Sequence, residues 1–343
     1  MSILITSDLH LTDRQADDYR WGLFPWIEEQ IDRWGIRSLC ILGDITDQKD
    51  KHSAVLTNRI VDALSRLSGK LHDGIICLRG NHDYTEPSTP FFRFLNCLAG
   101  VKFVTEAYDT GLGSYNVLFL PNSRTPEEEW SKYDLAGEYD FIFMHQTFNG
   151  AESESGVQLN GVDTSILSGI KAKIISGDVH VPQKLGRVTY VGSPYRVHFG
   201  DKFKPRVLLL RDINEMSGNK EQIQDLHFKT TTRMTIELPD SQHFKDMEFD
   251  GDTQVKVRLK LSASDMLDWE KHKKEIIQAC MDKGITLYQL ELIRQEDLTQ
   301  RVEAQEAVLK NLTPNQIFDE YCKLHKVDNR VKEYGLQVLS QAK

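Results

Sequence analysis

The chain has 343 residues, of which 40% are hydrophobic and 27% charged, a composition typical of a globular protein with one large domain or a large and a small one. Its formal net charge of −9 argues against indiscriminate nucleic-acid binding through bulk charge, although it leaves room for a local basic surface. The five cysteines are scattered and form no C-x-x-C pair, so we expect a cytoplasmic protein without a disulfide framework or a zinc ribbon. No apolar stretch approaches the roughly 20 residues that span a bilayer, so we expect no membrane span.

The first 200 residues alternate short apolar runs with amphipathic stretches. The apolar runs predict buried strands at 3–6, 39–42, 75–78, 117–120, 141–144 and 174–176. Apolar residues at helical spacing predict helices at roughly 17–34 and 53–68. Because strands alternate with helices, we predict an α/β domain with a largely buried sheet.

The pattern changes after residue 200. Residues 214–225 are polar and predict a loop, and the strictly alternating 255–261 predicts a half-buried strand. A helix at 264–283 is expected to end at Gly284, before a second strand at 285–293. Two helical stretches, about 296–310 and 314–326, follow. We therefore divide the chain into a main domain at 1–210, a small β-α-β cap at 211–295 and C-terminal helices at 296–343.

Five short motifs of acidic, amide and imidazole residues each follow a predicted strand directly. They are Asp8-Leu9-His10, Gly43-Asp44-Ile45-Thr46-Asp47, Gly80-Asn81-His82-Asp83, His145 and Gly177-Asp178-Val179-His180. Open α/β sheets build their sites in loops at the carboxyl ends of strands. Taken singly, Asp8 is equally consistent with a helix N-cap, Asn81 with a turn and His145 with a packed core histidine. Taken together, the five motifs predict one metal site.

The residue types suit the hydrolysis of a phosphodiester. Two divalent ions about 3.5–4 Å apart activate the attacking water and neutralise the charge on the attacking and leaving oxygens. Mixed carboxylate, imidazole and amide ligands favour Mn²⁺, Fe²⁺ or Zn²⁺ over calcium, and Asp44 is a candidate to bridge the two ions.

These motifs resemble those of the calcineurin-like metallophosphoesterases, over roughly residues 1–200. The resemblance implies a four-layer α/β/β/α sandwich with two metals at one edge. It implies one metal held by Asp8, His10, Asp44 and His180, and a second held by Asp44, Asn81, His145 and Asp178. It further implies that His82 is the catalytic histidine, positioned by Asp83, and that Asp47 supports the ligands without binding metal.

One residue departs from the family pattern, because Asp178 stands where the family has histidine. A carboxylate there adds negative charge and a hard oxygen ligand, so we expect a preference for Mn²⁺, with Mg²⁺ as the second candidate. The alternative is a weakened second metal position with low activity.

Weaker similarities point to SbcD-type nucleases, which process DNA ends together with a coiled-coil ATPase. The segment 192–200, Gly-Ser-Pro-Tyr-Arg-Val-His-Phe-Gly, resembles one of their motifs, as does 312–321, Leu-Thr-Pro-Asn-Gln-Ile-Phe-Asp-Glu-Tyr. The β-α-β cap is similar to their small capping domain. The likeness implies a SbcC-type ATPase partner and a homodimer; for the C-terminal helices, packing on their own domain is the alternative to docking the ATPase.

The cap contributes a physical argument of its own. Lys256, Arg258 and Lys260 share one face of the strand predicted at 255–261, where they could follow a phosphate backbone. A solvated sheet face, or protection of a sheet edge against pairing, explains the same pattern.

Three functions are consistent with the sequence. The first is a Mn²⁺-dependent DNA nuclease of SbcD type, acting in DNA end processing, recombination or repair. The second is a phosphodiesterase or phosphatase for a small nucleotide or phosphoprotein. The third is a catalytically weakened scaffold that binds DNA, which Asp178 motivates.

Overall fold

The computed structural model describes residues 2–211, 222–249, 251–261 and 265–294, with six separate residues nearer the C-terminus: Phe318, Tyr321, Cys322, Val331, Lys332 and Leu336. The chain divides into two compact units, residues 1–235 with 249–256 and residues 236–248 with 257–343. Apart from those six residues, the predicted C-terminal helices lie outside the described residues. The loop prediction at 214–225 is wrong at its end, where a strand begins at Ile223.

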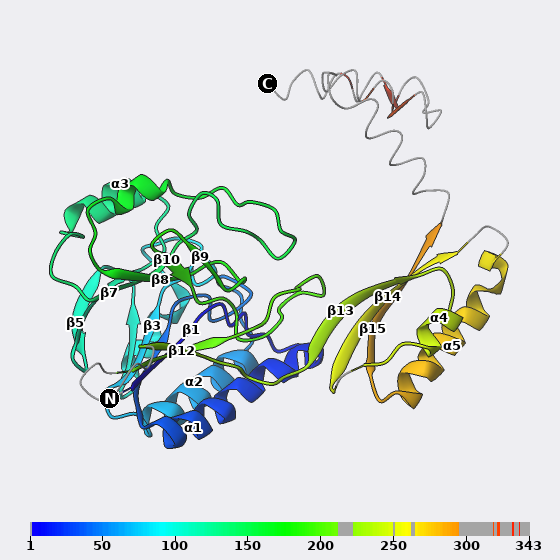
Figure 1. Ribbon diagram of the computed structural model, residues 1–343, viewed down its shortest axis with the longest axis horizontal. Coiled ribbons are helices and arrows are strands. Elements are labelled where there is room, and N and C mark those ends of the chain that lie inside the picture. The colour runs from blue at the N-terminus through cyan, green and yellow to red at the C-terminus, as the bar shows by residue number, and fades with distance from the viewer. Residues whose placement is uncertain are drawn as a thin grey trace. The chain divides into compact units, whose positions relative to one another are not determined.

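Two six-stranded sheets form the first unit (Figure 1). The first sheet contains, in order, β12 (Ile223–Leu226), β11 (Val207–Arg211), β1 (Ser2–Thr6), β2 (Ile36–Ile41), β3 (Gly74–Leu78) and β4 (Val101–Val104). The second contains β5 (Tyr108–Leu112), β6 (Tyr115–Leu120), β7 (Phe141–His145), β8 (Lys173–Gly177), β10 (Val188–Tyr190) and β9 (Gln183–Leu185). All six predicted strands are present, and the apolar runs that predicted them are buried.

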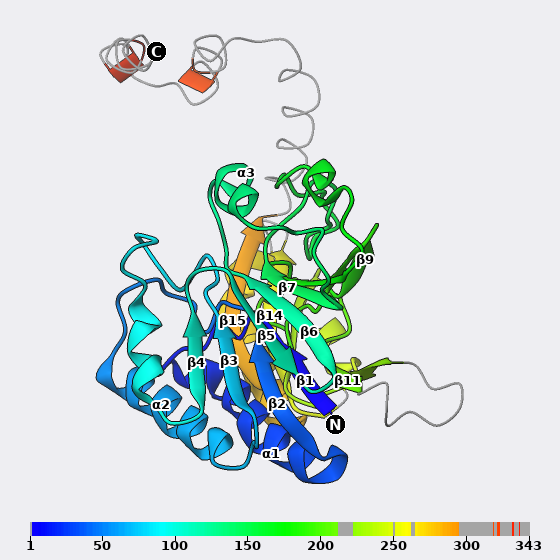
Figure 2. The same cartoon turned by 90° about the vertical axis from the view of Figure 1, so that its left-hand side faces the viewer.

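Parallel pairing places the site motifs at a common edge. In the first sheet, strands β1, β2, β3 and β4 are parallel to one another and lie side by side (Figure 2). In the second sheet, β6, β7, β8 and β10 are parallel to one another. The strands β11, β12, β5 and β9 pair antiparallel with their neighbours. Because parallel strands end at the same edge, the loops after β1, β2, β3, β7 and β8 gather their side chains there.

Three apolar clusters separate the layers. Helices α1 (Leu23–Trp34) and α2 (Ala54–Ser68) pack on the outer face of the first sheet. A second cluster, with side chains from both sheets, fills the space between them. The third covers the outer face of the second sheet with α3 (Pro126–Glu129), short 3₁₀ turns and loops. The α/β/β/α order is therefore confirmed, although its fourth layer contains only short helices.

Local sequence explains where the helices begin and end. The helix predicted at 17–34 is a 3₁₀ helix, Gln15–Gly22, that continues into α1. It ends at Gly35, whose left-handed backbone (φ 59°) suits glycine. The Oγ of Ser53 caps α2 by accepting the backbone N–H of Leu56.

The second unit is built on a three-stranded sheet whose strands β13 (Thr232–Leu238) and β14 (Thr253–Leu261) begin in residues of the first unit. The order is β13-β14-β15, with β15 at Thr286–Arg294 and helices α4 (Gln242–Lys245) and α5 (Trp269–Asp282). The predicted β-α-β pattern is present as β14, α5 and β15, whereas β13 was not predicted. Among the described residues, no helix has both the length and the apolar character needed to cross a membrane.

Candidate metal centre

The loops at the shared sheet edge bring the predicted ligands together. Three overlapping trios have ligand atoms within 4.8 Å of one another: Asp8 with His10 and His180, His10 with Asp44 and His82, and Asp8 with Asp44 and His145. These residues follow several different strands and are nearly all buried. The trios link the residues into one cluster.

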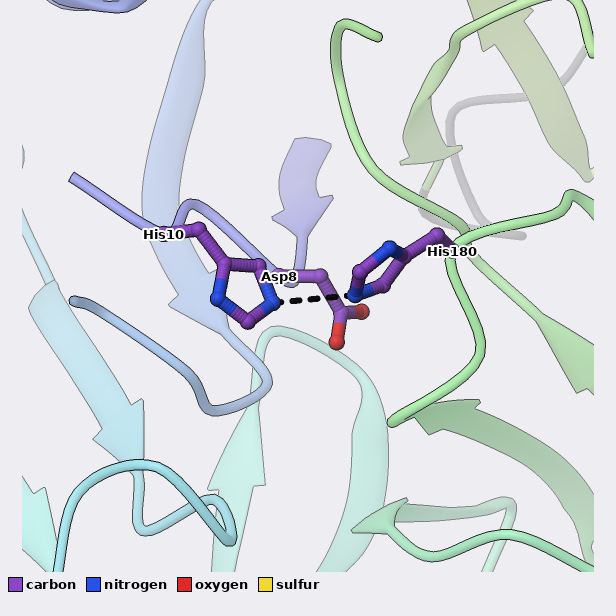
Figure 3. Close-up of side chains that lie close together, drawn as sticks. All are labelled: Asp8, His10 and His180. Atoms are coloured by element: carbon purple, nitrogen blue, oxygen red, sulfur yellow. Dashed lines mark hydrogen bonds between the residues drawn. The ribbon is translucent and has the colours of Figure 1, made fainter. Parts of the chain in front are cut away.

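One half of the cluster contains Asp8, His10, Asp44 and His180. The Nε2 atoms of His10 and His180 lie 2.9 Å apart, and Figure 3 shows the two imidazoles facing one another beside the Asp8 carboxylate. Asp44 Oδ2 lies 3.6 Å from His10 Nε2. The Oδ2 atom of Asp8 is buried and has no hydrogen-bond partner among the described residues. Buried carboxylate oxygens and imidazole nitrogens that converge on one point, without enough hydrogen-bond partners, can bind a divalent cation there.

The other half contains Asp44, Asn81, His145 and Asp178. The Nε2 atom of His145 lies 3.3 Å from Asp44 Oδ1, 3.3 Å from Asn81 Oδ1 and 3.5 Å from Asp178 Oδ1. Asp44 thus directs Oδ1 towards this half and Oδ2 towards His10. This arrangement suits a carboxylate shared between two ions.

The backbone at the centre is held in an uncommon conformation. Asp8 (φ 55°), His10 (φ 43°), Asp44 (φ 55°) and Asp178 (φ 78°) are the non-glycine residues with positive φ in the described chain, and all four are predicted ligands. Such left-handed residues cost roughly 1–3 kcal/mol each and cluster at functional sites. Gly43 (φ 94°) precedes Asp44, and a Cβ there would clash with the imidazole of His145.

Asp83 has a different role from the predicted one. Its Oδ2 accepts the backbone N–H groups of Asp44 (2.9 Å) and Gly80 (2.7 Å), and its Oδ1 accepts that of Ile45 (3.0 Å). The Nδ1 atom of His82 instead lies 2.7 Å from the backbone carbonyl of Asp47. Asp83 therefore fixes the ligand loops, whereas the carbonyl of Asp47 contacts the imidazole that we predicted Asp83 to position.

Asp47, which we predicted to support the ligands, lies beside two of the site histidines. Its carbonyl positions His82, and its side chain lies 3.8 Å from His10 Nδ1 and 3.3 Å from the guanidinium of Arg14. The backbone N–H of His82 donates to Asp44 Oδ1 at 2.8 Å, so the catalytic candidate and the bridging candidate are tied together.

Two residues at the centre were not predicted. Thr147 Oγ1 donates to Asp178 Oδ2 at 2.7 Å, which leaves Oδ1 facing His145. Glu154 Oε1 lies 2.6 Å from His180 Nδ1. Both follow β7 in a polar loop without apolar periodicity, so the sequence carried no signal beyond the presence of a carboxylate and a hydroxyl.

Burial and charge shift the pKa values of the ligand candidates and of Glu154. Burial raises the pKa of Asp8 to about 6. Burial also acts to raise the pKa of Asp44, but the positive charge of His145 outweighs it and the net shift is downward. The pKa of His145 is raised because Asp44 and Asp178 outweigh its desolvation. In the same way Glu154 and Asp8 overcome burial and raise the pKa of His180 to about 9. His180 in turn lowers the pKa of Glu154 to about 2.

The predicted DNA-contact residues lie on one face of β14. Lys256, Arg258 and Lys260 are half-buried and alternate with fully buried apolar residues, as predicted. Arg258 contacts Glu291 (2.8 Å) and Glu237 (3.2 Å), and Lys260 contacts Glu237 (2.6 Å). These ion pairs offset part of the positive charge of the face, so a phosphate backbone would have to compete with two carboxylates.

Comparison of the sequence with models of known protein families identifies the family of the chain. The model described as "Calcineurin-like phosphoesterase" matches residues 1–182, more than half of the chain. The chain belongs to the calcineurin-like phosphoesterase family. Phosphoester hydrolysis with divalent metal ions is the chemistry of this family, and its motif positions are those that converge here.

The solved structures that the chain resembles share little of its sequence. A protein described as a novel archaeal phosphodiesterase is 12% identical over 66% of this chain and 99% of its own, with a TM-score of 0.36. GAP50, described as the anchor in the inner membrane complex of Plasmodium, is 13% identical over 61% of this chain and 81% of its own, with a TM-score of 0.43. No curated protein sequence matches the chain.

The residues of this phosphoesterase fit the two ions that its family uses. Bound at such a centre, two divalent ions neutralise the phosphoryl group and activate the attacking water. The chain itself supplies four oxygen donors, from Asp8, Asp44, Asn81 and Asp178, and three imidazoles, from His10, His145 and His180. Beside them lies His82, with its ring centroid 4.9 Å from that of His10; its predicted role is to donate a proton or a hydrogen bond to a leaving oxygen.

Proposed function

We propose that the chain is a Mn²⁺-dependent DNA nuclease subunit of SbcD type, which works with a coiled-coil ATPase and forms a homodimer. The observation that carries the proposal is the segment 192–200, whose sequence resembles a motif of those nucleases. This segment packs against the loop after β1 that carries Asp8 and His10. Ser193 Oγ donates to the carbonyl of Asp8 at 3.0 Å, and the hydroxyl of Tyr195 donates to the carbonyl of Leu9.

The choice of metal follows from the donor set. Asp178 stands where the family has histidine, and its Oδ1 faces His145 among the other ligand candidates. Four oxygen donors against three imidazoles make the centre harder than one with an additional histidine. This composition supports Mn²⁺, or Mg²⁺, over softer ions.

Substrate choice separates this proposal from its alternatives. The purified chain, with and without its co-expressed ATPase, is given linear duplex DNA and an aryl phosphodiester in Mn²⁺, Mg²⁺ or Zn²⁺. We expect degradation of DNA in Mn²⁺. Turnover of the aryl diester without attack on DNA would favour a small-nucleotide phosphodiesterase. Loss of both activities with metal still bound would favour a DNA-binding scaffold.

Two variants make this assay specific. Asp44→Ala should abolish hydrolysis because both halves of the centre lose a ligand. Asp62→Ala, a surface aspartate in α2, is the matched control and should behave as the parent. Hydrolysis by Asp44→Ala at the parent rate would refute the dimetal assignment.

The DNA-contact role of the cap is tested separately. Replacing Lys256, Arg258 and Lys260 with Gln should weaken DNA binding and flatten its salt dependence, by up to about one unit of log–log slope for each phosphate that is no longer neutralised. Glu237→Gln should act in the opposite direction, because it removes the carboxylate that pairs with Lys260 and one of the two that pair with Arg258. Unchanged affinity in both variants would assign this face to internal ion pairing.

A further inference from the structure

His180 is held from the side opposite its metal-facing nitrogen. Its Nε2 lies 2.9 Å from His10 Nε2, inside the ligand cluster, whereas its Nδ1 lies 2.6 Å from Glu154 Oε1. The contact with Glu154 is an ion pair whose angle lies outside the hydrogen-bond range. Both side chains are largely covered, with 14% of His180 and 26% of Glu154 exposed. A carboxylate therefore lies beside the ring nitrogen that is not directed at the ligand cluster.

The loop that carries Glu154 is fastened on both sides of that residue. An isolated β-bridge joins Glu152 to Gln158, and Ser153 donates its backbone N–H to the carbonyl of Val157 at 2.9 Å. The side chain of Gln183, in β9, bonds the backbone N–H of Glu152 at 2.9 Å and its carbonyl at 2.8 Å. Glu154 thus lies at the turn of a small anchored hairpin, which fixes its approach to His180.

A second contact limits rotation of the same ring. The imidazole of His198 stacks on that of His180, with ring centroids 5.8 Å apart and planes 27° from parallel. The backbone beneath His198 is fixed by Asp201, whose Oδ2 accepts the N–H groups of Val197 (2.8 Å) and His198 (2.9 Å). Glu154 holds the edge of the His180 ring, and His198 covers one face.

We propose that Glu154 is a positioning residue that holds the proton of His180 on Nδ1 and so presents the Nε2 lone pair to a metal ion. A histidine ligand needs its other nitrogen protonated and oriented by an acceptor, and a carboxylate is the strongest acceptor available for this purpose. Loss of such a partner commonly reduces metal affinity by 10- to 100-fold.

This inference rests on the metal centre and is independent of DNA as substrate. The experiment therefore measures metal binding directly, by calorimetric titration of the metal-free chain with Mn²⁺. Two ions binding to the parent establish the centre before any variant is compared. A parent that binds no Mn²⁺ would refute the metal centre, and so both proposals, whereas a parent that binds two ions but degrades no DNA would refute the nuclease proposal alone.

Three variants of the same hairpin isolate the effect of Glu154. Glu154→Ala should lower the affinity for one of the two Mn²⁺ ions by 10- to 100-fold. Glu154→Gln should stay within about threefold of the parent, because its amide oxygen still accepts from Nδ1–H. Glu152→Ala, which changes a carboxylate two residues away, should be unchanged. Parent-like affinity in Glu154→Ala would overturn the proposal, as would a reduction in Glu154→Gln equal to that in Glu154→Ala.

The tautomer gives a second readout that does not depend on affinity. Long-range ¹⁵N–¹H correlation spectra of the chain loaded with diamagnetic Zn²⁺ should show His180 protonated on Nδ1 in the parent and in Glu154→Gln. In Glu154→Ala the Nδ1–H signal should broaden or shift as the proton becomes exchangeable with water. Identical His180 signals in all three proteins would show that Glu154 has no part in positioning the ring.

Discussion

Asp83 accepts the backbone N–H of Asp44 through Oδ2 at 2.9 Å, so a fully buried carboxylate holds the residue that lies between the two halves of the metal centre. The same oxygen accepts from Gly80, one residue before Asn81. The loops after β2 and β3 are thereby locked to each other independently of any metal.

Replacing Asp83 with Asn tests this lock. The amide group has one accepting oxygen where the carboxylate has two, so at least one of the backbone N–H groups of Asp44, Ile45 and Gly80 loses its acceptor. A buried unsatisfied donor costs roughly 1–3 kcal/mol. We expect a lower free energy of unfolding in the metal-free chain and weaker Mn²⁺ binding. If unfolding is affected but metal binding is not, Asp83 supports the fold without shaping the ligand loops.

His82 is expected to act on the reaction and not on the metal. His82→Ala should reduce the rate of diester hydrolysis by roughly 10²–10⁴-fold, the usual range for loss of an acid–base or charge-stabilising group. Metal titration should still show two ions. The exposed His72, which contacts Asp73 on the surface, supplies the control variant His72→Ala. Should metal occupancy fall together with the rate, His82 is itself a ligand, an outcome that its place beside His10 and Asp44 leaves open.

Asp178 is expected to determine how hard the donor set of the second ion position is. Asp178→His should shift the metal preference towards Zn²⁺ or Fe²⁺, because an imidazole replaces an oxygen donor. Histidine is among the residues that tolerate positive φ, so the fold should survive the change at φ 78°. Asp178→Ala should lower the affinity for the second ion and slow diester hydrolysis at limiting metal. The rate should partly recover in excess metal. Two tightly bound ions in Asp178→Ala would exclude Asp178 as a ligand.

Metal binding and stability should depend on pH in opposite directions. The pKa of His180 is raised to about 9, so below that pH an ion must displace its proton. Apparent affinity should therefore rise by up to about tenfold per pH unit between pH 7 and 9. A histidine with a raised pKa stabilises the folded state below pH 6.5 and loses that contribution as pH rises to 9. Without metal, the chain should thus become less stable across the window in which it binds metal better.

Both quantities can be measured on one preparation. Calorimetry in two buffers of different ionisation enthalpy counts the protons released by Mn²⁺, and chemical unfolding in chelator follows the stability of the metal-free chain. Mn²⁺ binding that releases no proton at about pH 7.5 would contradict the raised pKa of His180. Asp8, with a pKa of about 6, titrates below this window.

The sequence predicted those parts of the site that depend on strand order. Asp8, Asp44 and His145 could be placed because each comes at or just after the end of an apolar run, and parallel pairing brings such ends to one edge. Glu154 could not be placed in the same way, because it lies in a polar hairpin whose position depends on the side chain of Gln183.

In the cap, too, the sequence could not predict features that depend on how separate segments pair. Alternation of apolar and basic residues correctly predicted which residues of β14 are buried. It could not show that Glu237 and Glu291 lie opposite Arg258, because this depends on how the three strands pair. The strand β13, which carries Glu237, was itself not predicted. Periodicity within one strand therefore reports burial, whereas the charge balance of a face depends on its neighbours.

The four predicted ligands with left-handed backbones lower the stability of the fold in exchange for the positions of their side chains. Each holds a side chain over the metal centre at a backbone cost of roughly 1–3 kcal/mol, which glycine at the same position would avoid. Replacing Asp178 or His10 with glycine relieves that cost and removes a ligand in the same step. A selection for heat resistance alone would therefore favour glycine at these positions and yield a sturdier protein that no longer hydrolyses phosphoesters.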